Sequence, residues 1–176
     1  MKIPNANCLL MVIDIQQKLM PVIKNGAEVI GNVSRLLAGA EILQIPVIVT
    51  EQNPNGLGKS VPELPLNRAT LFEKFTFDAM ENPELENALQ SGASVVVVGC
   101  ESHVCVLQTV LGLLKRNIVV FVVEDAIGSR SGASKAAAIR RMATNGAEIV
   151  TTEMVLFEWL GSSQHPSFRK VLELVR

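Results

Sequence analysis

A cysteine placed where a predicted strand runs into a predicted helix is the most reactive group in this sequence. Cys105 follows the strand predicted over Ser94–Gly99 by a short bend, and it lies in the first turn of a helix predicted over His103–Lys115. The positive end of the helix dipole and the unpaired N–H groups of that turn favour a thiolate over a thiol. The same N–H groups can hold a developing oxyanion. This arrangement predicts a nucleophile for acyl transfer.

Two charged residues follow other apolar runs. Asp14 ends the run Leu9–Ile13, and Lys74 follows a short apolar pair. In an open parallel sheet the reacting groups gather beyond the carboxyl ends of the strands, so we expect Asp14, Lys74 and Cys105 at one edge. Three phenylalanines flank the lysine and are expected to form dry walls around its ammonium: Phe72, Phe75 and Phe77.

Each of the three polar residues also has a purely structural interpretation. Asp14 could only cap a following helix, and Lys74 could be an ordinary surface lysine. Cys105 could be an inert core cysteine, because free cysteine is among the most buried residue types. Cys8 and Cys100 fit that role better, since they lie within apolar strands.

The two histidines are weaker candidates for chemistry. His103 lies two positions before Cys105 at a helix start, so its side chain points to a different face. Polar packing or pocket lining is the expected role of His103, although it is a rival base. His165 precedes a proline in the tail, and we expect it to be structural.

Apolar runs of strand length alternate with longer segments whose apolar residues recur at helical spacing. The predicted strands are Cys8–Ile13, Pro46–Thr50, Ser94–Gly99, Ile118–Val123 and Glu148–Thr151. The predicted helices are 27–43, 83–91, 103–115 and 134–145, with stops at Gly92, Asn117 and Gly146. Strands rich in Val and Ile between helices favour a parallel sheet covered on both faces. The sequence therefore predicts a single domain over residues 1–176, built as a three-layer α/β/α sandwich.

Two segments stand outside this alternation. From Glu51 to about Arg68 the chain holds too many prolines and glycines for a helix, and irregular loops of that length are often functional. The tail predicts two short helices, over 153–160 and 166–175. Their apolar faces could pack on the sheet or meet another subunit.

Composition excludes several classes of protein. The chain has 16 Lys plus Arg against 17 Asp plus Glu, and no basic cluster longer than a pair, so we expect no nucleic-acid partner. No apolar run approaches the roughly 20 residues of a membrane span, and the polar start lacks a signal-peptide pattern. We therefore expect a cytoplasmic protein without a membrane partner. Three cysteines without CxxC spacing predict reduced thiols rather than a disulfide framework or a thiolate zinc site.

Three segments together resemble the isochorismatase-like cysteine hydrolases, which include nicotinamidases and N-carbamoylsarcosine amidases. The matching segments are Val12–Gln16, Phe72–Lys74 and Gly99–Val106, and nearly the whole chain takes part. The loop after the second strand and the tail look most like the isochorismatase domain-containing subgroup. The resemblance implies a mostly parallel, Rossmann-like sheet of six strands in the order 3-2-1-4-5-6, a non-proline cis peptide bond just before Glu101, and a homo-oligomer.

The resemblance also implies a role for each matched residue. Cys105 would be the nucleophile, Asp14 the acceptor and later donor of its proton, and Lys74 the cation that stabilises the thiolate. The backbone N–H groups of Glu101 and Cys105 would form the oxyanion hole. A nearby ammonium and the helix dipole would lower the pKa of the thiol below its usual value.

The segment after the second strand departs from the nicotinamidases, which carry histidines there to bind a metal. Thr50–Pro54 contains no histidine, so we expect no metal and no cofactor, and nicotinamide becomes a weaker candidate substrate. Cys105 also argues against the vinyl ether cleavage of isochorismatases proper, which lack a cysteine there. The low aromatic content of 4% predicts a small carbonyl substrate. Position alone suggests six substrate-pocket residues: Gln16, Gln52, Phe72, Phe77, Ser102 and His103.

The leading hypothesis is a metal-free cysteine hydrolase that cleaves a small amide or a related C–N bond through a thioester. The alternative from another class is a catalytically idle interaction protein that keeps the hydrolase fold. A third possibility is a redox sensor in which Cys100 and Cys105 form a reversible disulfide. An enzyme of the first kind is expected to hold an acidic Cys105 thiol that reacts at about pH 6 to 7, which a scaffold does not need.

Overall fold

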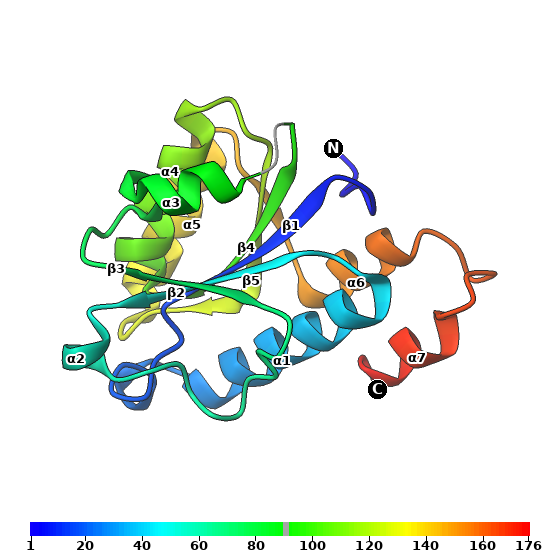
Figure 1. Cartoon of the computed structure of the whole chain (residues 1–176), viewed down its shortest axis with the longest axis horizontal. Coiled ribbons are helices and arrows are strands. Elements are labelled where there is room, and N and C mark those ends of the chain that lie inside the picture. Colours follow the sequence, from blue (N-terminus) through cyan, green and yellow to red (C-terminus); the bar gives the residue numbers. More distant parts are fainter. Residues whose placement is uncertain (90–91) are drawn as a thin grey trace.

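A six-stranded sheet runs through the centre of the molecule, and its neighbouring strands are all parallel (Figure 1). The structure is a computed structural model that describes residues 1–89 and 92–176. The strand order β3-β2-β1-β4-β5-β6 is the predicted one. The strands are β1 Cys8–Ile13, β2 Val47–Gln52, β3 Thr70–Lys74, β4 Ser94–Cys100, β5 Val120–Gly128 and β6 Glu148–Val150.

The two central strands, β1 and β4, are buried along their whole length. A strand covered on both faces reads as a continuous apolar run rather than as an alternation of apolar and polar residues. In β1, Leu10 and Val12 belong to one core, whereas Leu9, Met11 and Ile13 belong to the other. The sheet therefore has a helical layer on each face.

Helices form these two layers (Figure 1). One face is covered by α1 Gly26–Leu43, α6 Thr152–Leu160 and α7 Phe168–Glu173. The other face is covered by α3 Pro83–Ala88, α4 Leu107–Lys115 and α5 Gly132–Thr144. The shorter helical segments are η1 Met20–Val22, α2 Pro54–Leu57, η2 Ala79–Glu81 and the π-helical turn η3 Ser102–Val106. The predicted three-layer sandwich is confirmed.

The two tail helices pack within the same subunit. In α6, Val155, Leu156 and Trp159 are buried in the core that α1 also lines. A methyl group at Gly39 of α1 would collide with Leu156, so a residue without a side chain lets α6 approach α1 closely. Along the described residues, no helix is both long and apolar enough to cross a membrane.

Several boundaries differ from the predicted ones. β3 was missed, because an edge strand whose residues are mostly exposed needs no apolar run. β5 continues past the predicted end to Gly128. The helix predicted over 83–91 ends at Ala88, and residues 90 and 91 lie outside the described residues.

Candidate active site

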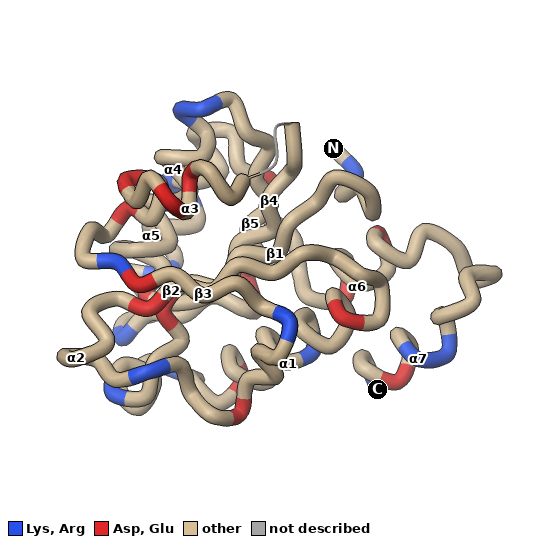
Figure 2. Tube along the Cα trace, in the orientation of Figure 1, with Lys and Arg blue, Asp and Glu red and all other residues tan. Residues whose placement is uncertain are grey.

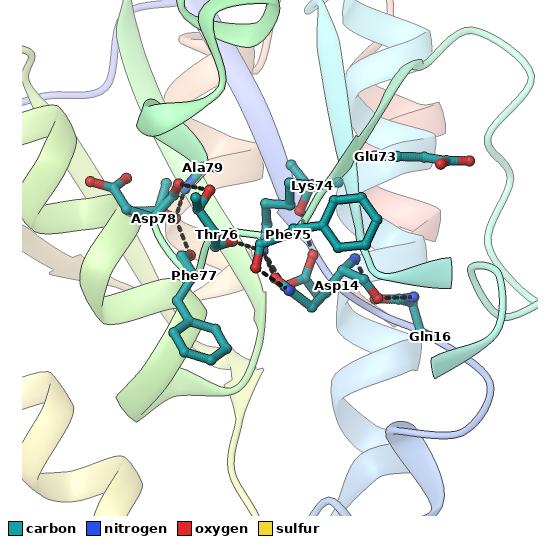
Figure 3. A network of polar contacts seen from close by, with 12 residues as sticks. Asp14, Gln16, Glu73, Lys74, Phe75, Thr76, Phe77, Asp78 and Ala79 are labelled. Atoms are coloured by element: carbon teal, nitrogen blue, oxygen red, sulfur yellow. Dashed lines mark hydrogen bonds and ion pairs between the residues drawn. The ribbon is translucent and has the colours of Figure 1, made fainter. Parts of the chain in front are cut away.

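A buried ion pair joins the ends of two strands at the carboxyl edge of the sheet (Figure 3). Lys74, the last residue of β3, donates from Nζ to Asp14 Oδ2 at 2.7 Å. Asp14 directly follows β1, and its backbone adopts a positive φ of 51°. The two side chains are only 1% and 0% exposed. The structure therefore brings together two of the three residues that the sequence predicted.

Strand β2 lies between these two strands and completes the hydrogen bonding of the pair. Thr50 donates from Oγ1 to Asp14 Oδ1 at 2.7 Å, and Gln52 Oε1 accepts from Lys74 Nζ at 2.7 Å. The Thr76 carbonyl accepts from the same Nζ at 3.3 Å. A buried ion pair is tolerated when further hydrogen bonds satisfy both ions, and these three contacts do so. Sequence reasoning missed Thr50, although its position two residues before Gln52 places both on one face of β2.

Cys105 lies on the π-helical turn η3, which leads into α4. The backbone N–H groups of Val104 and Val106 both donate to the Glu101 carbonyl, at 3.0 and 3.2 Å. The residues on either side of Cys105 in the chain are therefore tied to the same carbonyl oxygen. π-helical turns are rare and are often found at functional sites. The residue is buried, with 7% of its surface exposed.

The Cys105 thiol lies within the electrostatic reach of the ion pair. Burial, and after it the negative charge of Asp14, raise its pKa to about 12, whereas the Lys74 ammonium acts to lower it. The expectation of a resting thiolate is therefore wrong. Removal from water outweighs the ammonium, so the thiol stays protonated at neutral pH.

The bend before Cys105 is attached to the end of β5. The Cys100–Glu101 peptide bond is cis, which is the form that the resemblance implies. Glu101 Oε2 accepts from the backbone N–H of Arg130 at 3.0 Å and from its Nε at 3.1 Å. Ser102 donates from Oγ to the Gly128 carbonyl at 2.9 Å. These contacts hold the Glu101 backbone at one place beside the ends of β4 and β5.

Gly99 allows β4 to reach this bend. Its φ of +124° is rare for any residue with a side chain, and a Cβ there would collide with the Ile13 backbone of β1. Only glycine fits both conditions, so β4 can lie against the end of β1 next to Asp14.

The residues predicted to line a substrate pocket are used in different ways. Gln16 is fully buried, and its side-chain amide makes hydrogen bonds with the backbone of Gln52 and Gly58. The Gln52 amide holds Lys74. The Ser102 hydroxyl is buried against β5, and His103 Nδ1 lies 3.0 Å from Ser129 Oγ. Substrate contact stays a prediction for each of the six residues.

The phenylalanines around Lys74 do not enclose it. Phe75 and Phe77 are 73% and 51% exposed, and Figure 3 shows their rings on opposite sides of the Lys74 segment. Phe72 is half-buried. The expectation of three dry aromatic walls is wrong, because hydrogen-bonding neighbours on β1 and β2 enclose the ammonium instead.

The side chains of the other two cysteines pack into the opposite core from Cys105. Cys100 packs in the core on the α1 side of the sheet, whereas Cys105 belongs to the core on the α4 side. A disulfide between them would have to cross the sheet, which removes the basis of the redox-sensor hypothesis. Burial is the main cause of a raised pKa for both Cys8 and Cys100. Among residues 1–89 and 92–176, no three His, Cys, Asp or Glu side chains cluster closely enough to share a metal ion.

Known proteins that this sequence resembles contain the same domain. Residues 8–154 match the family described as the isochorismatase domain. Isochorismatase domain-containing protein 1 of Danio rerio is 41% identical over 166 residues, which are 93% of this chain, so the chain spans 59% of the length of that relative. Isochorismatase domain-containing protein 2 of Xenopus laevis is 37% identical over 99% of this chain and 86% of its own length.

Solved structures share the whole fold. The structure named MAR1 ribonuclease, from Caenorhabditis elegans, has a TM-score of 0.93 and 41% identity over 99% of this chain and 92% of that one. YcaC from Pseudomonas aeruginosa, with hexane-2,5-diol and covalent acrylamide, has a TM-score of 0.91 and 25% identity over 98% and 91%. YcaC of Escherichia coli, described as an octameric hydrolase of unknown specificity, has a TM-score of 0.84 and 24% identity over 98% and 95%, a likeness of fold alone.

Proposed function

The chain belongs to the isochorismatase family, and on that premise we propose that it is a metal-free cysteine hydrolase for a small amide or a related C–N bond. One observation carries the proposal. A buried carboxylate and a buried ammonium, 2.7 Å apart, both act on the pKa of a thiol at the start of a helix. Burying charges is costly, so a fold that keeps two of them beside a nucleophile favours a chemical role for the three groups.

The reaction starts from a neutral thiol. As Cys105 Sγ attacks the substrate carbonyl, its proton passes to the Asp14 carboxylate, which acts as general base. The negative charge thereby moves from oxygen towards sulfur and then to the carbonyl oxygen. Lys74 binds Asp14, and its charge acts on the thiol, so one ammonium balances the charge before and after the transfer. A preformed thiolate is not required.

The tetrahedral intermediate places a negative charge on the former carbonyl oxygen. The backbone N–H groups of Glu101 and Cys105 would stabilise it, in a bend that the Arg130 and Val106 contacts hold in place. Asp14 returns the proton to the leaving nitrogen, which departs as ammonia or an amine and leaves a thioester. Water, activated by Asp14, then cleaves the thioester, releases a carboxylic acid and restores the thiol.

A structural relative supports a nucleophile in such a site. The YcaC structure from Pseudomonas aeruginosa holds covalent acrylamide, a small amide that is also an electrophile. A covalent bond to acrylamide requires a nucleophilic side chain, and thiolates are the most reactive of these in proteins. We propose Cys105 for that part in this chain.

The Caenorhabditis elegans relative is named a ribonuclease, so RNA is a substrate to test. RNA binding usually needs a basic surface that contacts phosphates. This chain has a net charge of −1, and Figure 2 shows Lys and Arg interspersed with Asp and Glu. The charge distribution therefore favours a small neutral substrate over a polyanion.

Substrate selection and assembly complete the proposal. Phe72, Phe77 and His103 are the side chains that we propose to contact the substrate. Phe72 lies on β3, Phe77 just after β3, and His103 on η3.

A homo-oligomer is proposed as well, since the Escherichia coli YcaC is octameric.

The direct test is ammonia release from a panel of small amides, ureides and carbamoyl compounds, with RNA cleavage measured in parallel. Replacing Cys105→Ala is expected to lower the rate on any active substrate by at least about 10³-fold, since the nucleophile is lost. Cys8→Ala removes a buried thiol far from the site and serves as the control that keeps activity. Full activity of Cys105→Ala would remove the thiol from the mechanism. Inactivity of the unmodified protein on the whole panel would favour the idle interaction protein.

A further inference from the structure

One face of β2 carries two side chains that contact opposite ends of the buried ion pair. Thr50 donates to Asp14 Oδ1, and Gln52, two residues later, accepts from Lys74 Nζ. Gln52 and Lys74 are also register partners across the β2–β3 ladder, so their Cα atoms are neighbours. Glu51, between them, points elsewhere and accepts hydrogen bonds from the Ser60 N–H and hydroxyl at 2.6 and 2.8 Å.

Every polar group of Gln52, in the side chain and in the backbone, makes a hydrogen bond. Its side-chain N–H donates to the Phe75 carbonyl at 2.7 Å, which turns the amide oxygen towards Lys74. Its backbone N–H donates to Gln16 Oε1 at 2.8 Å, and its carbonyl accepts from Gln16 Nε2 at 3.1 Å. Gln16 is anchored in turn on the Gly58 carbonyl at 2.6 Å. A side chain locked in this way is not available to adapt to a substrate.

We propose that Gln52 is a positioning residue, which holds the Lys74 ammonium on Asp14 and within the electrostatic reach of the Cys105 thiol. This inference rests on the proposed hydrolase function. While a proton moves between sulfur and Asp14, the ammonium must stay close to both groups. Gln52 and the Thr76 carbonyl are the two neutral acceptors that hold it in addition to Asp14.

A neutral side chain suits position 52, because its oxygen accepts from the Lys74 ammonium. The charge of Asp14 already acts on the thiol, and the carboxyl of Asp78, from the loop after β3, interacts with the charge of Lys74. An amide oxygen accepts from the ammonium without adding a further negative charge beside the thiol. A carboxylate at position 52 would compete with Asp14 for Lys74 and oppose ionisation of the sulfur.

The competing interpretation is that Gln52 contacts the substrate. The two roles separate in steady-state kinetics, because loss of a substrate contact raises KM, whereas misplacement of Lys74 lowers kcat. They also separate without any substrate. A positioning role alters the reactivity of Cys105 towards a small electrophile such as iodoacetamide, and a substrate-contact role does not.

The experiment compares Gln52→Met and Gln52→Glu with the same two changes at Gln164, an exposed glutamine of the C-terminal loop. The alkylation rate of Cys105 by iodoacetamide is measured from about pH 7 to 10 and assigned by peptide mapping, and circular dichroism checks the fold. We expect Gln52→Met to slow alkylation about threefold or more, and Gln52→Glu to slow it further, as each raises the pKa of the thiol. The Gln164 variants should match the unmodified protein.

On an active substrate from the panel, Gln52→Met should lower kcat about tenfold or more with KM nearly unchanged. An unchanged alkylation profile in both Gln52 variants, or a higher KM with kcat intact, would overturn the positioning role. If Gln52→Met does not fold, Gln52→Ala replaces it in the same measurements, because it also removes the oxygen that accepts from Lys74. If no substrate is found, the hydrolase proposal fails, while the alkylation profile still decides whether Gln52 positions Lys74.

Discussion

At the level of single residues, the site depends on the ammonium of Lys74, which acts on a carboxylate and on a thiol. Lys74 binds the Asp14 carboxylate and its charge acts on the Cys105 thiol, while burial keeps the sulfur protonated at rest. A carboxylate next to a neutral thiol is a proton acceptor already in place. The cost of this arrangement is a pair of charges inside the protein, which Thr50, Gln52 and Thr76 make tolerable.

Removing one charge of the pair should therefore destabilise the fold. Lys74→Met leaves the Asp14 carboxylate buried without a cation, and we expect the free energy of unfolding to fall by about 3 to 5 kcal/mol. The double variant with Asp14→Asn removes both charges and should lose less than Lys74→Met alone. Urea unfolding, followed by the fluorescence of the single and buried Trp159, measures both.

An exposed ion pair provides the control for the Lys74 variants. Arg116 and Glu86 are 2.6 Å apart but have side chains 32% and 48% exposed, so Glu86→Gln should cost less than about 1 kcal/mol. A Lys74→Met variant as stable as its double would contradict the view that Asp14 is left as an uncompensated buried charge.

At the scale of elements, the carboxyl ends of β1, β2, β3 and β4 meet because the sheet is parallel and β1 is central. β1 leads into Asp14, β2 ends in Gln52, β3 ends in Lys74, and β4 leads into the bend before Cys105. The last of these needs a backbone contact between β4 and β1 that leaves no room for a side chain at Gly99. Strand order thus decides which residues meet, and one glycine decides how closely.

Substitutions at two glycines with positive φ, Gly99 and Gly146, separate the strain of the backbone conformation from the collision with β1. Gly99→Ala adds a collision with the Ile13 backbone to the conformational strain, so we expect a loss above about 3 kcal/mol or no folding at all. Gly146 has a φ of +105°, and no atom lies within 4 Å of the position that a methyl group would take there, so Gly146→Ala should cost only about 1 to 2 kcal/mol. Urea unfolding of both variants checks the order, and equal losses would show that the Ile13 contact is not limiting.

At the scale of the whole molecule, three thiols are buried in two cores. Cys8 and Cys100 lie on the α1 side and Cys105 on the α4 side, and burial is the largest cause of a raised pKa in each. The folded protein therefore holds these protons at a pH where the unfolded chain has released them. Stability linked to the thiols is complete below their ordinary value of 9.0 and is lost as the pH rises above it.

Stability should accordingly decline in alkaline solution. Each thiol that stays protonated only in the folded state lowers the free energy of unfolding by up to about 1.4 kcal/mol per pH unit above its unfolded pKa. For Cys105 this decline extends from pH 9.0 to its folded pKa of about 12. Urea unfolding at several pH values between these limits should show a shallower decline in Cys105→Ala than in the unmodified protein. Parallel declines would contradict a thiol that is protonated in the folded state.

Local patterns in the sequence predicted the layers of this protein, which the structure confirms, and three candidate residues of its site, two of which the structure joins in an ion pair. Continuous apolar runs mark buried parallel strands wherever they occur, and Asp14 and Cys105 are the polar residues that follow two of them. Such patterns are local, so they can be read without coordinates. The edge strand β3 left only a weak pattern, because it buries little.

Only the tertiary structure decided which groups touch and which are charged. Thr50 and Gln52 reach the ion pair because β2 lies between β1 and β3, and Cys100 is separated from Cys105 because successive strand residues face opposite cores. The protonation of Cys105 depends on the sum of burial, Asp14 and Lys74. That sum runs over atoms distant in the chain, so no local pattern can predict its sign.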